Sequence, residues 1–154
     1  MIKAFKYKLY PTKIQTQELN WVLIRCRELY NAALEERIIA YKNCKKSINY
    51  YDQKKSLPEI KEVRPEYKKL HSQVLQDVIL RLDRGFQAFF KRVKQGLTPG
   101  FPRFQGRNRF NSFTFPQAAN TGIKILEDQR LKVYGLSGSL KVKWHRELEG
   151  KLKT

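Results

Sequence analysis

The residues with the clearest capacity for chemistry lie in one aromatic and basic segment, residues 101–115. Its sequence is FPRFQGRNRFNSFTF, with five Phe, three Arg and two Asn. Arginine neutralises phosphate or stacks on a base, asparagine and glutamine bond to base edges, and phenylalanine stacks on an unpaired base. Alternate phenylalanines can instead fill a core, the interpretation we favour for Phe113 and Phe115. Phosphate contact is favoured for the three arginines, which have no acidic neighbours in the segment: Arg103, Arg107 and Arg109.

Positive charge extends well beyond this segment. The chain has 154 residues with 32 Lys+Arg and 14 Asp+Glu, a formal net charge of +18. No acidic residue occurs in the 43 residues from Arg84 to Leu126. Lysine and arginine at this density can replace the counterions condensed on a phosphate backbone, so nucleic acid is the expected partner. We predict backbone contacts for seven residues: Lys91, Arg92, Lys94, Arg103, Arg107, Arg109 and Lys124.

The sequence offers no catalytic constellation and no metal-binding motif. His71 and His145 belong to different predicted elements, and neither has a Ser or Cys at a recognisable nucleophile spacing. Neither a Cys-x-x-Cys motif nor a Walker-type glycine loop is present. Asp77 and Asp83 lie six residues apart on a predicted helix, where salt bridges to neighbouring arginines are expected. We therefore predict no catalytic residues, no metal site and no cofactor in these residues.

Cysteine content and hydropathy bear on the compartment. Cys26 and Cys44 are too few for a disulfide framework or a four-cysteine site. Cys26 falls on an apolar helical stripe, which predicts a buried rather than a reactive thiol. No run of 18 apolar residues and no signal-peptide block is present, so we expect no membrane partner and a cytoplasmic location.

Two long amphipathic helices are predicted to position this chemistry. Residues 2–10 alternate like a half-buried strand, and Thr12 with Gln15 forms a capping box that begins a helix reaching about residue 43. Residues 66–95 repeat apolar side chains every three to four positions and predict the second helix, packed on the first as a hairpin. Between them, the prolines of residues 43–65 predict a connector with at most a short helix.

After residue 96 the sequence changes from helical periodicity to a Pro- and Gly-containing segment followed by short alternating stretches. Two Pro and two Gly within residues 97–106 predict a loop, and short alternating stretches near 113, 123, 131 and 140 predict strands. The predicted fold class is α+β, a small antiparallel β-barrel split by a helical insertion of two long amphipathic helices and a short one. We expect residues 1–11 and 97–154 to form the barrel and residues 12–96 the helical domain.

Ordered sequence matches identify a resemblance to the OrfB/TnpB proteins of insertion sequences. They cover essentially the whole chain: FKYKLYPT at 5–12, RELYNAAL at 27–34, LQDV at 75–78, FFK at 89–91, GFPRFQGR at 100–107 and SFTF at 112–115. The family consists of proteins called transposases that act as RNA-guided DNA endonucleases related to type V CRISPR effectors. The resemblance implies a wedge-like barrel that holds guide RNA, interrupted by a helical recognition domain.

The same resemblance implies residues that face a short target-adjacent DNA motif. By similarity they are Tyr50, Lys54, Ser72, Gln73, Gln76, Pro116 and Gln117. Ser72 departs from the pattern if a basic residue is usual there, and Pro116 cannot donate a backbone hydrogen bond. The preferred DNA motif therefore does not transfer to this chain.

The resemblance also sets expectations about what surrounds these residues. Family members continue into a RuvC-like nuclease domain with three metal-binding acids and a zinc ribbon, so Mg and Zn are expected only there. We expect a nuclease-free N-terminal part whose partners are guide RNA, double-stranded DNA with a short adjacent motif, and a downstream nuclease domain. The alternatives are an active transposase or endonuclease completed by a separate polypeptide, and a general structural RNA-binding protein.

Overall fold

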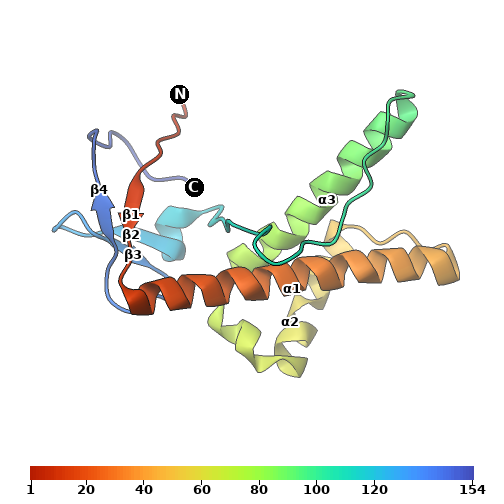
Figure 1. Ribbon diagram of the computed structural model, residues 1–154, viewed down its shortest axis with the longest axis horizontal. Helices are drawn as coiled ribbons and strands as arrows, with labels where there is room; N and C mark the ends of the chain where they lie inside the picture. Colours follow the sequence, from red (N-terminus) through yellow and green to blue (C-terminus); the bar gives the residue numbers. More distant parts are fainter.

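A computed structural model describes residues 1–154, the side chain of Asn120 excepted. Three α-helices make up most of the regular secondary structure, and four short strands lie together at one end (Figure 1). The elements follow the order β1 (Lys8–Tyr10), α1 (Lys13–Cys44), α2 (Tyr50–Val63), a 3₁₀ turn (Pro65–Lys69), α3 (Ser72–Lys94), a π-helical turn (Ala118–Gly122), β2 (Ile123–Ile125), β3 (Leu131–Val133) and β4 (Lys141–Lys143). The α+β class is therefore confirmed.

Local sequence explains both ends of α1. The Thr12 hydroxyl accepts a hydrogen bond from the Gln15 amide at 3.2 Å, and the Gln15 side chain accepts one from the Thr12 amide at 3.0 Å. This reciprocal capping box is the predicted one. The helix ends at Lys45, whose φ of 53° places it in the left-handed region. Cys26 is fully buried, as predicted, and burial raises the pKa of its thiol to about 12.

Residues 43–65 contain the predicted third helix, but it is longer than expected, and the prediction that the segment is mainly a connector was wrong. Helix α2 spans 14 residues of it, with Pro58 inside the helix. Asn49 caps α2 by accepting from the amides of Tyr51 and Asp52, and the Asp52 carboxylate accepts from the Asn49 amide. Pro58 is exposed, and the buried side chain of Leu57 holds the helix on the core. The cap and this burial together offset the hydrogen bond that proline removes.

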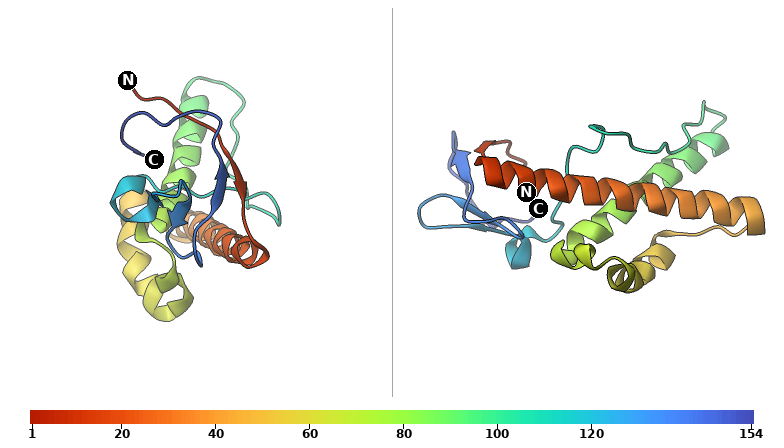
Figure 2. Two further views of the ribbon diagram at one scale, coloured as in Figure 1. Left: turned by 90° about the vertical axis from the view of Figure 1, so that its left-hand side faces the viewer. Right: turned by 60° about the horizontal axis from the view of Figure 1, so that its bottom comes forward.

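Helix α3 begins later than predicted, at Ser72, after the 3₁₀ turn. Its buried face carries the predicted apolar repeat, including Val74, Val78 and Leu82. The helices α1 and α3 cross obliquely instead of forming the predicted hairpin, with α2 beneath the crossing (Figures 1 and 2). The core lies at this crossing and continues to Leu140 near the strands.

The strands pair as two antiparallel ribbons, β1 with β4 and β2 with β3. An isolated bridge between Leu131 and Leu140 joins them, with backbone bonds of 2.9 and 2.7 Å. The expected strand over 2–10 shortens to Lys8–Tyr10, and residues 113–115 form no strand. Among the described residues no pairing closes a barrel. None of the described helices is long and apolar enough to cross a membrane.

Candidate nucleic-acid interface

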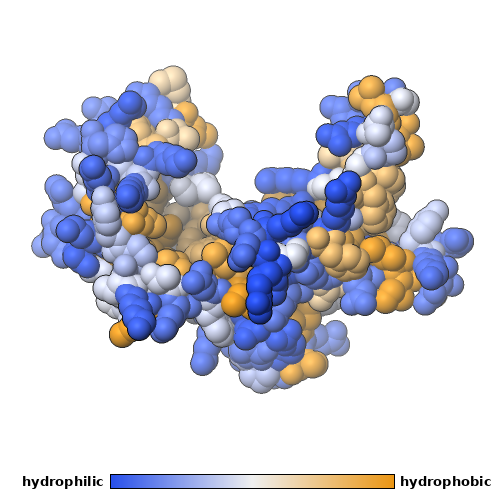
Figure 3. Space-filling view, in the orientation of Figure 1, coloured by the Kyte–Doolittle hydropathy of each residue, from blue (hydrophilic) through white to orange (hydrophobic). Residues whose placement is uncertain are grey.

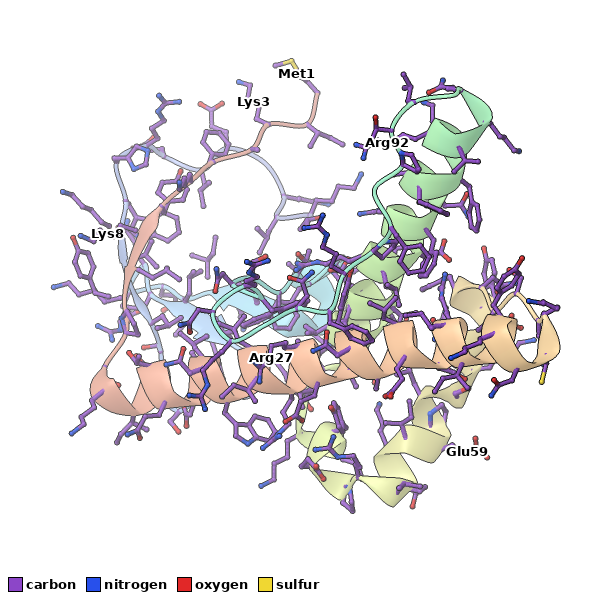
Figure 4. The ribbon with its side chains drawn as sticks, turned by 45° about the vertical axis from the view of Figure 1, so that its right-hand side comes forward. Met1, Lys3, Lys8, Arg27, Glu59 and Arg92 are labelled. Atoms are coloured by element: carbon purple, nitrogen blue, oxygen red, sulfur yellow. The ribbon has the colours of Figure 1, made fainter. Side chains whose placement is uncertain are left out.

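Six of the seven residues in the predicted backbone-contact set lie at the end of α3 or in the loop that follows it. Figure 3 shows two arms with a hollow between them, one built on the strands and the other on the end of α3. Lys91, Arg92 and Lys94 lie exposed on the last turns of α3. The chain then returns along α3, so close that a Cβ added at Gly100 would lie 3.1 Å from a guanidinium nitrogen of Arg92 (Figure 4).

Aromatic and polar contacts fix the returning loop on the helices. The ring of Phe101 contacts Phe86 and Phe89 edge to face, with centroids 5.4 and 5.2 Å apart. Asn31 of α1 donates to the Gln105 carbonyl at 3.0 Å and accepts from the Gln105 amide at 2.8 Å. Because α1 and α3 hold it at several points, the loop presents a fixed backbone rather than a free coil.

Arg103, Arg107 and Arg109 project from this loop and are exposed. None of them takes part in an ion pair among the residues that the structure describes. Arg81 behaves differently: it binds the Asp77 carboxylate at 2.9 Å and also donates to the Ser112 carbonyl at 2.7 Å. Arg81 therefore anchors the loop, while the three loop arginines remain available to a phosphate backbone.

Predicted motif-facing residues meet at the beginning of α3. The Gln73 amide nitrogen donates to the Gln117 side-chain oxygen at 3.3 Å, and the Gln117 backbone amide donates to the Gln73 side-chain oxygen at 3.2 Å. Ser72 is exposed beside them and accepts from the Lys61 ammonium at 2.8 Å. Pro116 precedes Gln117 and is half-buried, as is Gln76 one helical turn along α3. Two amide side chains and a hydroxyl thus share one small surface.

The remaining motif-facing residues lie elsewhere. Tyr50 and Lys54 occupy the first turn and a half of α2, whereas Lys61, which touches Ser72, is near its other end. Lys61 follows Tyr50 by 11 positions and Lys54 by seven, which correspond to about 16 Å and about 10 Å along a helix. Lys54 lies over the Tyr50 ring, 5.8 Å from its centroid. The structure therefore does not bring this pair to the Gln73 and Gln117 surface.

His71, for which the sequence favours a solvated or base-contacting role over catalysis, connects the helices to the strand region. Its Nδ1 accepts from the Gln73 backbone amide at 3.2 Å and caps α3, while Nε2 lies 2.6 Å from the Thr121 hydroxyl. Its ring also contacts Phe115 and Tyr134 edge to face. Burial, and then the charge of Lys61, lowers the pKa of His71. His71 directly precedes the apolar repeat of α3, but the sequence did not indicate a cap there because the usual N-cap residues are Ser, Thr, Asp and Asn.

Lys124, the last of the backbone-contact set, lies on β2 directly opposite Lys132 of β3. Both lysines are exposed and line a hollow of about 540 Å³ that also includes Tyr134. In the part of the chain that the structure describes, no group of three His, Cys, Asp or Glu side chains could hold a metal ion. The chemistry that this surface carries is cationic and hydrogen-bonding.

Comparison with known proteins finds a matching family model and proteins of similar sequence. The helix-turn-helix domain of OrfB proteins of the IS605 type matches residues 1–46, which here form β1 and the single long helix α1. The chain is 29% identical over 95% of its length to a Streptomyces pristinaespiralis protein named "Putative RNA-guided DNA endonuclease". It is 27% identical over 99% of its length to "Putative RNA-guided DNA endonuclease InsQ" of Escherichia coli K12.

The resemblance to OrfB/TnpB proteins is confirmed. It extends over nearly the whole chain, whereas the chain spans 35% and 36% of the length of these two relatives. The OrfB/TnpB-like sequence therefore includes the crossing helices, the basic loop and the strand region together. The roles of the individual site residues stay predictions.

Proposed function

We propose that residues 1–154 form a nucleic-acid-binding module of the OrfB/TnpB type that binds guide-type RNA and double-stranded DNA with a short adjacent motif. The observation that carries the proposal is the loop of residues 101–115, which α1 and α3 hold in place with its arginines exposed. The names of the two relatives, both RNA-guided DNA endonucleases, support RNA and DNA as the ligands. The long stretch without acidic residues adds a field that attracts phosphate.

The proposal distinguishes contacts to phosphates from contacts to base edges. The arginines of the loop and the cations at the end of α3 neutralise phosphates, which position a nucleic acid without reading it. The surface of Ser72, Gln73 and Gln117 reads base edges, because a glutamine amide can donate and accept at once to one base. On binding, these amides exchange their mutual hydrogen bonds for bonds to bases.

The module would bind and not cut. Cleavage is assigned to the portion of the relatives outside the matched third, where the resemblance places a metal-dependent nuclease. We also propose that the four strands, already joined in the order β1, β4, β3, β2, curl toward the wedge-like barrel of the family. Mg²⁺-dependent cleavage of DNA by this chain, abolished by EDTA, would contradict the assignment of cleavage elsewhere.

The test is a salt titration of binding with two matched triple variants. Fluorescence anisotropy would follow a labelled RNA hairpin and a labelled DNA duplex. In the first variant the loop arginines are replaced (R103Q, R107Q, R109Q); in the second, exposed lysines outside the loop, at the end of α1 and on α2, are replaced (K42Q, K46Q, K55Q). Both remove three positive charges, so net charge alone affects them equally.

We expect only the loop variant to lose specific phosphate contacts. Each contact contributes about 0.9 to the slope of log affinity against log salt for duplex DNA, so that slope should fall by about 2 to 3. The variant outside the loop should keep nearly the wild-type slope. Equal slopes for the two variants would refute the loop as the interface.

A further inference from the structure

A second basic surface lies on the ribbon formed by β1 and β4, away from the loop of residues 101–115. Lys8 pairs directly with Lys143, and Tyr10 with Lys141, in the antiparallel register. Directly opposite residues, and residues two apart on a strand, share a face of the sheet. Three lysines and one tyrosine therefore occupy one face of this ribbon. Figure 4 shows Lys8 on the side of β1 that faces away from the helices.

No acidic side chain pairs with the lysines of this face among the described residues. Like charges placed directly opposite each other destabilise a strand pair. The ion pairs found within the described residues all lie in the helical segments, and none includes Lys8, Lys141 or Lys143. All three lysines are exposed. A ribbon that concentrates uncompensated cations in this way is suited to an anionic ligand.

Aromatic rings are interleaved with these lysines. The ammonium groups of Lys8 and Lys141 lie 5.4 and 5.9 Å from the Tyr10 ring centroid, and Tyr10 remains 42% exposed. Before the start of β1, the Tyr7 ring contacts His145, with centroids 4.8 Å apart. These two rings, with Lys6, Lys8 and Lys143, line a shallow hollow of about 600 Å³.

We infer that the β1–β4 ribbon is a binding site for an unpaired nucleic-acid strand. Lys8, Lys141 and Lys143 contact its phosphates, and Tyr10 stacks on a base. An aromatic platform can stack only on a base whose face is free, as in single strands and loops. The inference rests on the proposed function, because it adds a second nucleic-acid surface to the same module.

Part of the ribbon is already fixed for this role. The Trp144 indole nitrogen donates to the Gln129 carbonyl at 2.6 Å, and Trp144 contacts the Tyr7 ring at a centroid distance of 4.8 Å. The Tyr7 hydroxyl donates to the Arg146 carbonyl at 3.3 Å. Tyr7 is therefore held by its neighbours, which reduces the ordering that binding requires.

The experiment measures binding of labelled oligouridylate and oligothymidylate, which form no base pairs, beside the RNA hairpin and the DNA duplex used above. Tyr10→Ala removes the exposed ring, Tyr10→Phe retains it, and K8Q with K143Q removes the opposed charges. We expect Tyr10→Ala to weaken oligouridylate binding roughly tenfold and Tyr10→Phe to preserve it. The double lysine variant should lower the single-strand salt slope by about 1.4. Oligothymidylate tells whether the site requires RNA or accepts either strand.

The outcomes separate this site from the proposed function. A hairpin that binds while oligouridylate does not, or oligouridylate binding that is unchanged in Tyr10→Ala, would overturn the ribbon site alone. Affinity for the DNA duplex that falls as much as oligouridylate affinity in Tyr10→Ala would also overturn it, since the ribbon would then contact paired nucleic acid. Failure of the wild type to bind any of these probes would overturn the proposed function as well. Oligouridylate binding that survives R103Q, R107Q and R109Q but not Tyr10→Ala would support two distinct sites.

Discussion

The helical crossing and the strand region differ in how they are stabilised. On α3, Val74, Val78 and Leu82 are at most 2% exposed and pack among α1 and α2. All three residues of β1 are exposed, and β2 has no fully buried residue. Burial of apolar surface is the main favourable contribution to folding. The helices therefore form the stable body, and the strands depend on their attachment to it.

That attachment combines an extension of the apolar core, which includes Val133 and Leu140, with polar contacts. Gln15 at the start of α1 donates to the carbonyls of Ser137 and Ser139 at 2.8 and 3.0 Å. Glu18, one turn further, accepts from the Ser137 amide at 2.9 Å. Hydrogen bonds from the Ser137 side chain and backbone lower the pKa of Glu18. A rigid body joined to a less buried region allows the two nucleic-acid surfaces to be perturbed separately.

Leu82→Ala should lower the stability of the helical body and the strand region more than any other variant considered. Leu82 is fully buried at the centre of α3, so truncation removes apolar contacts and leaves a cavity. We expect a loss of about 2 to 5 kcal/mol in the free energy of unfolding. In a Trp21→Phe background, helix ellipticity reports the body and Trp144 fluorescence reports the strands. Because the strands depend on the body, both transitions should move to lower urea concentration. A shift in Trp144 fluorescence alone would contradict this dependence.

Gly122→Ala tests whether the strand region can be destabilised more than the helices. A Cβ at Gly122 would overlap the ring of Phe115, which is itself buried against the core. Forcing in the extra methyl group should cost about 1 to 3 kcal/mol. We expect the Trp144 transition to shift more than the helix transition, since local regions with less burial open first. Gly106→Ala is the matched control because nothing lies within 4 Å of its added Cβ.

Equal shifts of the two transitions in Gly122→Ala would show that strands and helices unfold as one unit. Two-state behaviour of that kind requires probes in different regions to report the same transition. The strand region would then be no less stable than the body, and the contrast in burial would have no energetic consequence.

Features specified by neighbouring residues were predictable from the sequence. The Thr12 and Gln15 capping box and the burial of Cys26 follow from spacings within one helix. A short third helix was predicted, but the length of α2 was underestimated because Pro58 was taken to interrupt it, although the cap at Asn49 and the burial of Leu57 prevail in the folded chain.

Features that join distant residues were not predictable in the same way. The bonds between Asn31 and Gln105 span 74 positions, and the Gln73 and Gln117 contacts span 44. Alternation places strand residues on a face but does not choose their partners, because register is set by tertiary packing. The predicted Arg, Lys and Gln set was found from composition and resemblance. Only the three-dimensional structure shows that some of these residues lie on a loop held by the helices and others on a polar surface at the start of α3.

The smallest expected effect is a pH dependence at the junction of the two regions. In the neutral His71 ring, Nδ1 accepts from the Gln73 amide, so Nε2 carries the proton and donates to Thr121. Protonation of Nδ1 removes the cap and places a cation at the positive end of the α3 dipole. The pKa of His71 is lowered from its ordinary value of 6.5, first by burial and then by Lys61.

Because the folded chain binds this proton less readily than the unfolded chain, stability at this site is complete above about pH 6.5 and is lost as pH falls toward the lowered pKa. His71→Asn supplies a cap that does not titrate. The unfolding free energies of wild type and His71→Asn are measured from about pH 7 to pH 5. As pH falls, the wild type should lose stability relative to the variant. A difference that stays constant with pH would mean that the proton on His71 does not control the junction. In that case the Thr121 bond and the ring contacts, rather than the cap, would hold α3 to the strand region.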